Sequence, residues 1–414
     1  MKVILLAGGR GSRSSDPLLP KILQELTPGW TLLDHWIELL ENQGFKNLEL
    51  VLGHGERQVR SHLRKTQSTS NLEISFVVDD QLSGTANALM YSKCFGQKSL
   101  VLMADTLSFL NYEKILAGIN LQETQVAFLA HKNSHMFDSD SVELSKDGSV
   151  QGFHKKGEAV NLNNSLALTG GFFLNSEAWI ALDKLKEKGD VVHDLFREIP
   201  TASVRVLPFV GLSMDCGTPA RLSKAKNLYS IWRNKDSVPI VVLDRDGTLV
   251  PDLPQGRSPS TKLSIESSDA LAIARANELG IPVFMVTNQP AIAKGWVSES
   301  DVERVHVELT QELAKFSAWI DEIVFCPHYP VGGFPGELTH LKTECHCRKP
   351  KTGLMEYLKT KYHLQGCEIW MIGDSDVDEA FANNCGARFV RVKHGSATGV
   401  ASGLEGLLGD WNSL

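Results

Sequence analysis

The chain has 414 residues and a formal net charge of −7 at pH 7. This length exceeds that of one ordinary domain, and the acidic balance argues against non-specific binding of nucleic acid. The first residues, MKVILLAGGRG, contain an apolar stretch too short for a signal-peptide core or a membrane span. We therefore expect a cytoplasmic protein of two domains that binds neither nucleic acid nor a membrane.

The first half of the chain alternates short apolar runs with helical periodicity. Strand candidates are KVILLA, LELVLG, LEISFVVD, SLVLMAD and QVAFLAH, which begin at residues 2, 48, 72, 99 and 125. Apolar residues at helical spacing predict a helix over residues 31–43, with Gly44 as its stop. This alternation predicts a parallel sheet covered by helices.

The alternation resumes after a polar stretch. A helix expected at residues 219–232 is followed by NKDSVP, so we place a domain boundary near residues 234–238. Strand candidates then follow at residues 239–243, 281–288, 368–374 and 387–392. One intervening helix opens with Ser298 and Asp301, a capping-box-like start. We predict two doubly wound, Rossmann-like α/β domains, over residues 1–234 and 238–414.

Polar motifs follow the strands of the second half, where sites in open α/β sheets are found. Residues 241–250 read VVLDRDGTLV, and the motifs TNQ, CRKP and GDSDVD follow in that order. Together they supply an aspartate nucleophile, a second acid, a hydroxyl, a lysine and further carboxylates for a metal. Each motif alone is also a common turn sequence. The complete set favours phosphoryl transfer through a covalent aspartyl intermediate.

In order and spacing these motifs resemble the haloacid dehalogenase superfamily of phosphatases, over nearly all of residues 238–395. The resemblance implies that Asp244 attacks phosphorus and becomes an aspartyl phosphate. It implies that Asp246 protonates the leaving alkoxide and then activates water. It also implies that Thr287 and Lys349 hold the phosphoryl oxygens.

The same resemblance implies a Mg²⁺ site in the second domain. Its ligands are expected to be the carboxylates of Asp244 and Asp374 and the backbone carbonyl of Asp246, with Asp378 in support. Hard oxygen ligands beside a substrate phosphate suit Mg²⁺ rather than a softer metal. We assign Asn288 to substrate binding.

A cluster of thiols predicts a second kind of metal site. Seven cysteines are few for this length, and their odd number argues against a disulfide framework. Cys326, His328, Cys345 and Cys347 have the spacings C-x-H and C-x-C, and His340 or His346 is an alternative to His328. Such ligands close a tetrahedral zinc site with no open position, so we predict a structural Zn²⁺. The alternative is a set of scattered buried thiols.

The segment that carries these thiols runs directly into Arg348. In this it resembles the branch of the superfamily formed by heptose 1,7-bisphosphate 7-phosphatases and histidinol-phosphate phosphatases. The resemblance implies that Arg348 contacts the distal phosphate or the sugar. The chain has TNQPAIAKG where the branch usually has TNQSGIARG, and Pro290 has no amide hydrogen to donate.

A glycine-rich segment, LLAGGRGSR, directly follows the first strand. Gly8, Gly9 and Gly11 allow backbone amides to converge on an anion. The segment is neither a dinucleotide-type GxGxxG nor a GxxxxGK[ST] loop. Other motif residues are Arg13, Pro20-Lys21, the turn Ser83-Gly84-Thr85-Ala86, Asp105 and Asp215. With these, residues 1 to about 230 resemble the sugar-phosphate nucleotidyltransferases, which have a GT-A-like fold.

This second resemblance implies roles for the motif residues. The glycine loop with Arg13 grips a triphosphate, and Lys21 offsets charge at the reacting phosphates. Asp105 and Asp215 share a Mg²⁺ ion. Gln81 with Gly84 reads the base, and Thr85 is a further residue that binds substrate or nucleotide. The chain has Met103-Ala104 where the family usually has Asn-Gly before the aspartate.

Together the two resemblances imply a bifunctional enzyme that acts on a nucleoside triphosphate and phosphorylated sugars. One domain is expected to remove the 7-phosphate of D-glycero-D-manno-heptose 1,7-bisphosphate. The other is expected to transfer a nucleotidyl group to the 1-phosphate, with GTP as the expected donor, and to release pyrophosphate. Alternatives are another phosphorylated sugar or polyol, or a non-catalytic first domain that senses a nucleotide. The sequence leaves the sugar, its anomer, the nucleotide and the oligomeric state open.

Overall fold

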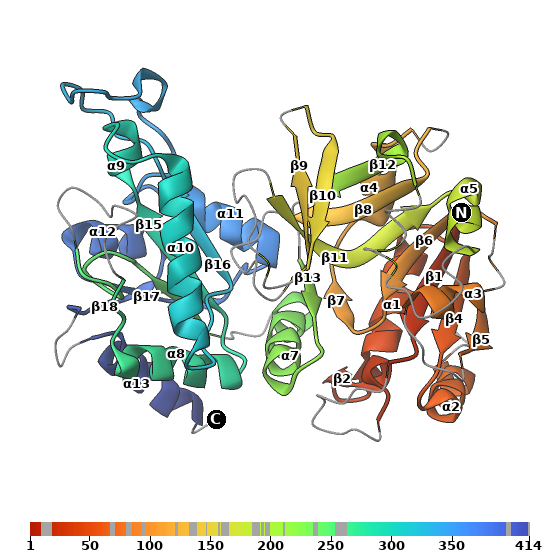
Figure 1. Ribbon diagram of the computed structural model, residues 1–414. Helices are drawn as coiled ribbons and strands as arrows, with labels where there is room; N and C mark the ends of the chain where they lie inside the picture. Colours follow the sequence, from red (N-terminus) through yellow and green to blue (C-terminus); the bar gives the residue numbers. More distant parts are fainter. Residues whose placement is uncertain are drawn as a thin grey trace. The chain divides into compact units, whose positions relative to one another are not determined.

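The computed structural model describes residues 1–9, 19–66, 71–79, 85–92, 94, 96–120, 123–131, 139–145, 147–155, 158, 165–183, 191, 194, 199–209, 212–234, 239–252, 263–394 and 399–412. The chain divides into two compact units, each with its own sheet and core, and the division falls between Ala225 and Lys226 (Figure 1). This point lies inside helix α7 (Pro219–Asn234). The later part of α7 belongs to the second unit, where the Asn227 amide donates to the carbonyls of Leu279 and Gly280 at 3.3 and 2.8 Å. The limits 1–234 and 238–414 remain our prediction for the two domains.

The first unit is built on a nine-stranded sheet. Its main path runs β10 (Val150–His154), β9 (Ser141–Leu144), β11 (Ser165–Leu174), β6 (Ser99–Met103), β1 (Lys2–Ala7), β4 (Asn47–Leu52) and β5 (Glu73–Val78). Two further strands are β8 (Val126–His131), which pairs with β11, and β12 (Val204–Pro208), which pairs with β8. Strands β6, β1, β4 and β5 are parallel, as predicted. Strand β11 is antiparallel to β6 and β8, so the prediction of an entirely parallel sheet was wrong.

Helices cover both faces of this sheet. On one face α1 (Leu32–Asn42), α2 (Glu56–Thr66) and α4 (Tyr112–Ala117) contribute to a single apolar cluster with alternate residues of β1 and β4. On the other face α3 (Thr85–Met90) and α5 (Ser176–Asp183) pack on the intervening residues. The remaining elements are η1 (Lys21–Leu23), η3 (Thr201–Ser203) and the strand pairs β2 (Glu25–Thr27) with β3 (Trp30–Thr31) and β7 (Thr106–Ser108) with β13 (Ser213–Asp215).

The second unit has a five-stranded parallel sheet. Its order is β16 (Glu322–Cys326), β15 (Val283–Asn288), β14 (Pro239–Leu243), β17 (Glu368–Gly373) and β18 (Arg388–Arg391). The chain enters at the central strand β14, extends to β15 and β16 on one side, and then returns to β17 and β18 on the other. This arrangement makes the carboxyl end of β14 the point where the strand order reverses, which is where ligands bind in open α/β sheets.

Helices also cover both faces of the second sheet. On one face α8 (Ser267–Glu278), α10 (Glu299–Ala314) and α13 (Val400–Asn412) share a core with Val241 and Leu243. Figure 1 shows α10 crossing this face. On the other face lie α11 (Gly353–Tyr362), whose Tyr362 ring meets Phe284 edge-on, and α12 (Asp376–Cys385). Two short helices are α9 (Pro290–Ala293) and η4 (Thr339–Leu341). The prediction of doubly wound α/β folds is confirmed.

No helix among the described residues is long and apolar enough to cross a membrane.

Candidate active sites

A pocket of about 290 Å³ opens at the carboxyl ends of β1 and β6 in the first unit. Five residues that the sequence predicted for this site line it: Gly8, Gly9, Lys21, Thr85 and Asp105. Four other predicted residues, Gly11, Arg13, Gln81 and Gly84, lie outside the described residues. The buried Asp79, at the end of β5, also lines the pocket and was not predicted.

Lys21 and the two predicted metal aspartates of this unit lie together. The Lys21 ammonium is 2.7 Å from Asp105 Oδ2. Strand β13 places Asp215 opposite Thr106, one residue after Asp105. A Cβ atom added to Gly217 would lie 2.7 Å from Asp215 Oδ1 and 3.2 Å from the Lys21 ammonium. Residues from three separate parts of the chain therefore converge at one edge of the pocket.

Both of these aspartates have basic partners. Asp215 Oδ2 accepts a hydrogen bond from Arg221 Nη1 at 2.5 Å, and Asp215 Oδ1 accepts one from the Gly217 amide at 2.7 Å. The Arg221 and Asp215 side chains are partly exposed to solvent. Ion pairs that are solvated in this way contribute little to stability. A divalent cation at the two carboxylates would compete with Lys21 and Arg221.

In the second unit, Lys349 joins two carboxylates at the end of β14. Its ammonium is 2.6 Å from Asp244 Oδ1 and 2.6 Å from Asp378 Oδ1. The three residues are only 3%, 7% and 1% exposed in the order Lys349, Asp244 and Asp378. Asp374 is the third acidic residue here, and one oxygen each of Asp244, Asp374 and Asp378 lie within 4.8 Å of one another. The structure thus brings Asp244, Lys349 and Asp374 together.

The electrostatics of this group favour a cation. The pKa of Asp244 is raised to about 7, mainly by burial; Lys349 lowers it, and the Asp378 and Asp246 carboxylates add to the increase. Burial and Asp378 also raise the pKa of Asp374. Burial lowers the pKa of Lys349, but Asp244 and Asp378 more than offset this, so its pKa lies above the ordinary value. Three close carboxylates with one ammonium fit a hard divalent cation, which removes the remaining repulsion.

Two glycines allow the carboxylates to come this close. Gly247 has φ of +80°, and a Cβ atom there would collide with the carboxylate of Asp374. A Cβ atom on Gly373 would lie 2.7 Å from Asp378 Cγ. Any side chain at either position would displace a carboxylate.

Asn288 fixes the backbone of Lys349. Its Nδ2 donates to the Lys349 carbonyl at 3.1 Å, and its Oδ1 accepts from the Lys349 amide at 3.0 Å. The neighbouring Arg348 donates to the His328 carbonyl at 3.2 Å and lies 5.1 Å from the centre of the Tyr329 ring. The end of β15 and the segment after β16 therefore both hold the Arg348-Lys349 pair.

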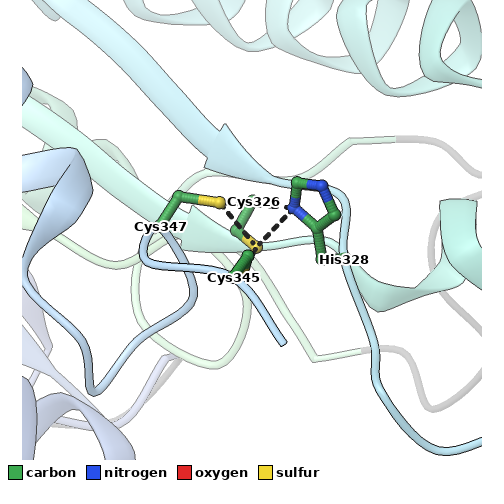
Figure 2. A group of neighbouring side chains, drawn as sticks. All are labelled: Cys326, His328, Cys345 and Cys347. Carbon is green, nitrogen blue, oxygen red and sulfur yellow. Dashed lines mark hydrogen bonds between the residues drawn. The ribbon is translucent and has the colours of Figure 1, made fainter. Parts of the chain in front are cut away.

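The four predicted zinc ligands gather at the end of β16. Figure 2 shows the three thiols and the His328 ring pointing toward one another. Cys326 Sγ is 3.5 Å from Cys345 Sγ and 3.3 Å from Cys347 Sγ, and Cys347 Sγ is 3.3 Å from His328 Nδ1. Around a tetrahedral zinc with Zn–S bonds of about 2.3 Å, sulfurs lie about 3.8 Å apart. The observed spacing and the Cys₃His donor set fit such an ion.

The predicted alternatives to His328 are placed elsewhere. His346 is exposed and its Nε2 is 2.9 Å from Glu356 Oε2. His340 is exposed on η4. Of the three histidines, only His328 belongs to the described metal-ligand group.

Comparison with known proteins gives the family. Residues 2–230 match the family described as nucleotidyl transferase. The chain belongs to the nucleotidyl transferase family. Residues 346–403 match the family described as HAD-hydrolase-like. We therefore call the two parts the nucleotidyltransferase unit and the phosphatase unit.

Curated relatives support the assignment of the phosphatase unit. The chain is 31% identical over 161 residues to the D-glycero-beta-D-manno-heptose-1,7-bisphosphate 7-phosphatase of Pseudomonas aeruginosa, a match of 38% of this chain and 84% of that protein. It is 34% identical over 155 residues to the histidine biosynthesis bifunctional protein HisB of Legionella pneumophila, covering 37% of this chain and 41% of that protein. Among solved structures, HddC from Yersinia pseudotuberculosis complexed with GMP-PN is 20% identical, with a TM-score of 0.45 over 55% of this chain and 99% of that chain. The chain is a bifunctional nucleotidyltransferase and phosphatase.

The phosphatase unit also contains polar contacts that the sequence did not reveal. Gln289 Nε2 donates to Asp246 Oδ2 at 2.8 Å and to Thr287 Oγ1 at 3.0 Å. Arg245 Nη2 donates to Asp246 Oδ2 at 2.7 Å. Gln289 stands in the motif TNQ and Arg245 between the two aspartates, so both positions were visible as motif residues. The contact of Gln289 with Asp246 could not be predicted, because it depends on how β14 and β15 are aligned.

Proposed function

We propose that the phosphatase unit hydrolyses the 7-phosphate of D-glycero-D-manno-heptose 1,7-bisphosphate. The observation that carries this proposal is the buried Asp244–Lys349 pair, whose lysine lies two residues after Cys347, the last residue of the Cys/His metal-ligand group. It is supported by relatives named D-glycero-beta-D-manno-heptose-1,7-bisphosphate 7-phosphatase, which match over most of their own length. The sugar phosphate enters at the carboxyl end of β14.

Two steps account for hydrolysis. In the first, a carboxylate oxygen of Asp244 attacks phosphorus, the bond from phosphorus to the sugar oxygen breaks, and Asp246 gives its proton to that oxygen. In the second, water attacks the aspartyl phosphate, Asp246 takes a proton from the water, and the bond from phosphorus to Asp244 breaks. Splitting one displacement into two steps in this way lowers each barrier. Lys349 and Thr287 hold the phosphoryl oxygens.

Each unit is proposed to hold Mg²⁺, which supplies charge neutralisation at the phosphoryl group when bound. In the phosphatase unit its ligands are Asp244, Asp374 and the backbone carbonyl of Asp246. In the nucleotidyltransferase unit its ligands are Asp105 and Asp215. The carboxylate groups described above fit this ion.

We infer that the nucleotidyltransferase unit transfers GMP from GTP to a heptose 1-phosphate. A sugar phosphate oxygen attacks the α-phosphorus in line, and pyrophosphate leaves. Positioning and charge neutralisation do most of this work, so a glycine loop beside Lys21 is suitable machinery. The proposal is supported by Gly8, Gly9, Lys21 and Asp105 lining one pocket. The product of the phosphatase unit is then the substrate of the second reaction.

The Cys₃His group is proposed to hold a structural Zn²⁺. Its four ligands leave no open position, so the ion has no catalytic role. Burial raises the pKa of the Cys326 thiol, and a bound cation favours the thiolate. The zinc fixes the segment that leads from Cys347 through Arg348 to Lys349.

A second candidate substrate is histidinol phosphate, because a HisB relative is 34% identical over 155 residues. Fusion to a nucleotidyltransferase argues against it, since such a reaction has no role in making histidine. Two further candidates are a different phosphorylated sugar or polyol as substrate, and a first unit that only senses a nucleotide. A product assay that crosses four nucleoside triphosphates with sugar 1-phosphates, bisphosphates and histidinol phosphate separates them.

Two substitutions test the separation of the activities. Asp105→Asn should abolish pyrophosphate release and leave phosphate release intact, while Asp244→Asn should do the reverse. Asp376→Asn is a matched control near the phosphatase site, because the Asp376 side chain is 96% exposed. Loss of both activities in either variant would show that the sites are not separate. Pyrophosphate release that survives Asp105→Asn would exclude the proposed metal role of Asp105.

A further inference from the structure

Arg245 is the most deeply buried cation beside the phosphatase site. It stands between the two aspartates of the first motif and is 1% exposed. A buried cation is costly unless it is paired and hydrogen-bonded. The partners of Arg245 therefore indicate what it does.

The guanidinium group is directed at the Asp246 carboxylate. Nη2 and Nε donate to Oδ2 at 2.7 and 3.1 Å, and Nε also donates a longer hydrogen bond to Oδ1 at 3.2 Å. Gln289 Nε2 donates to Oδ2 as well, at 2.8 Å. The short hydrogen bonds from two side chains thus converge on Oδ2.

His306 holds the guanidinium from the opposite end. Arg245 Nη1 lies 2.9 Å from His306 Nε2, and both side chains are buried. A guanidinium nitrogen only donates, so His306 Nε2 is the acceptor and the ring is neutral, with its proton on Nδ1. His306 projects from α10, and its ring lies 5.5 Å from that of Phe325 on β16. The Arg245 guanidinium is therefore held between the Asp246 carboxylate and a histidine of α10.

We propose that Arg245, oriented by His306, is a positioning residue for proton transfer by Asp246. Together with Gln289 it binds Oδ2, so that Oδ1 is the oxygen that carries the transferred proton. This inference rests on the proposed phosphatase reaction, in which Asp246 is the acid and base.

The chemistry of the first step follows from this arrangement. The proton on Asp246 Oδ1 moves to the sugar oxygen as its bond to phosphorus breaks, and the electron pair of the O–H bond stays on the carboxylate. Arg245 then faces a carboxylate whose full negative charge is shared by Oδ1 and Oδ2, so its attraction is stronger after the transfer than before. Interactions that strengthen along the reaction lower its barrier. The second step returns a proton from water to Oδ1.

The dependence of the rate on the leaving group tests this role. p-Nitrophenolate is a stable anion that leaves without being protonated. Phenolate is more basic, so its departure is accelerated more when the enzyme supplies a proton. The measured quantity is kcat/KM, which covers the steps up to the aspartyl phosphate. Arg245→Met should lower kcat/KM for phenyl phosphate by about 100-fold, the lower end of what general acid catalysis contributes. It should lower kcat/KM for p-nitrophenyl phosphate by less than about tenfold.

Variants of His306 provide a second, milder test. His306→Gln keeps an acceptor for Arg245 and should retain the rate on phenyl phosphate. His306→Leu removes the acceptor and should show the selective loss on phenyl phosphate. Lys361→Met is the control for removal of a buried cation, because Lys361 is 6% exposed and its partner Glu322 starts β16, at the edge of the sheet away from the site. This variant should lower the two rates equally, if at all.

The outcomes separate this inference from the proposed function. Equal losses on both substrates in Arg245→Met and His306→Leu would overturn the positioning role. If Arg245→Met does not fold, the two His306 variants decide the question. A wild-type chain that hydrolyses neither substrate, nor a sugar bisphosphate, would instead overturn the proposed phosphatase reaction. Selective loss on phenyl phosphate, with rescue by His306→Gln, supports both.

Discussion

Replacing Lys349 by methionine removes the only ammonium group that the structure describes between Asp244 and Asp378. Both N–O distances are 2.6 Å, and all three side chains are at most 10% exposed. Breaking a buried ion pair by removing one partner costs about 3–5 kcal/mol, since it leaves an uncompensated buried charge. Here two carboxylates lose their partner, and Asp374 adds a third charge nearby. We therefore expect Lys349→Met to lower the unfolding free energy of the phosphatase unit by about 3–5 kcal/mol without added metal.

Hydrogen–deuterium exchange in urea, resolved by mass spectrometry, measures this loss unit by unit. Peptides from β14 and β17 report the phosphatase unit, and peptides from β1 and β6 report the other. Lys361→Met is the matched control, because Lys361 is also buried but pairs with a single carboxylate, that of Glu322, at 2.8 Å. Added Mg²⁺ should restore more stability to Lys349→Met than to the wild type or to the control. The proposed role of Lys349 as the counterion of Asp244 and Asp378 would be refuted if Lys349→Met were as stable as Lys361→Met and if Mg²⁺ stabilised neither variant more than the other.

Metal analysis should find about one zinc per chain, and Cys345→Ser should lower both the zinc content and the stability of the phosphatase unit. A zinc-free chain with freely reactive thiols would contradict this site. Arg221→Gln should tighten Mg²⁺ binding to the nucleotidyltransferase unit up to about fivefold, because Asp215 loses a partly exposed partner. Calorimetry measures this in a chain that also carries Asp244→Asn, which weakens the Mg²⁺ site of the phosphatase unit. Unchanged or weaker binding would show that Arg221 does not compete with the ion. His363 has φ of +55° and burial lowers its pKa. His363→Gly should stabilise by about 1 kcal/mol at pH 8, and the gain in denaturant midpoint should grow toward pH 5, since only the wild type loses stability as its histidine is protonated.

Much of the fold could be predicted because buried parallel strands are continuous apolar runs between polar residues. Strands β1, β6, β14, β15 and β17 are all of this kind. Strand β16 was missed, because its short run EIVFC leads directly into the metal-ligand segment. Strand β11 was not among the predicted strands, and its antiparallel direction could not be predicted because an apolar run carries no information about direction. Direction depends on the connection between strands.

The candidate sites, like the fold, could be predicted from the sequence only in part. Asp244, Lys349 and Asp374 were predicted to meet, and they do so because each follows or adjoins the carboxyl end of a parallel strand. The contact between Arg245 and His306 was not predicted, because these residues are 61 positions apart and His306 resembles any buried polar residue on a helix. A single sequence reveals motifs close to strand ends, whereas the residues that orient a motif come from the packing of distant helices.

Asp378 uses its two oxygens for different tasks. Oδ2 accepts from the Ser375 hydroxyl at 2.6 Å in the capping box that begins α12, while Oδ1 holds Lys349. The first turn of a helix and the charge of the reaction centre are thus set by one side chain. In a mutational scan, every substitution at this position would change folding and turnover at once, so its intolerance would be misread as a purely chemical requirement. The same coupling constrains natural substitution: a change at Asp378 that alters the reaction also removes the cap of α12, unless Ser375 or another residue caps the helix instead.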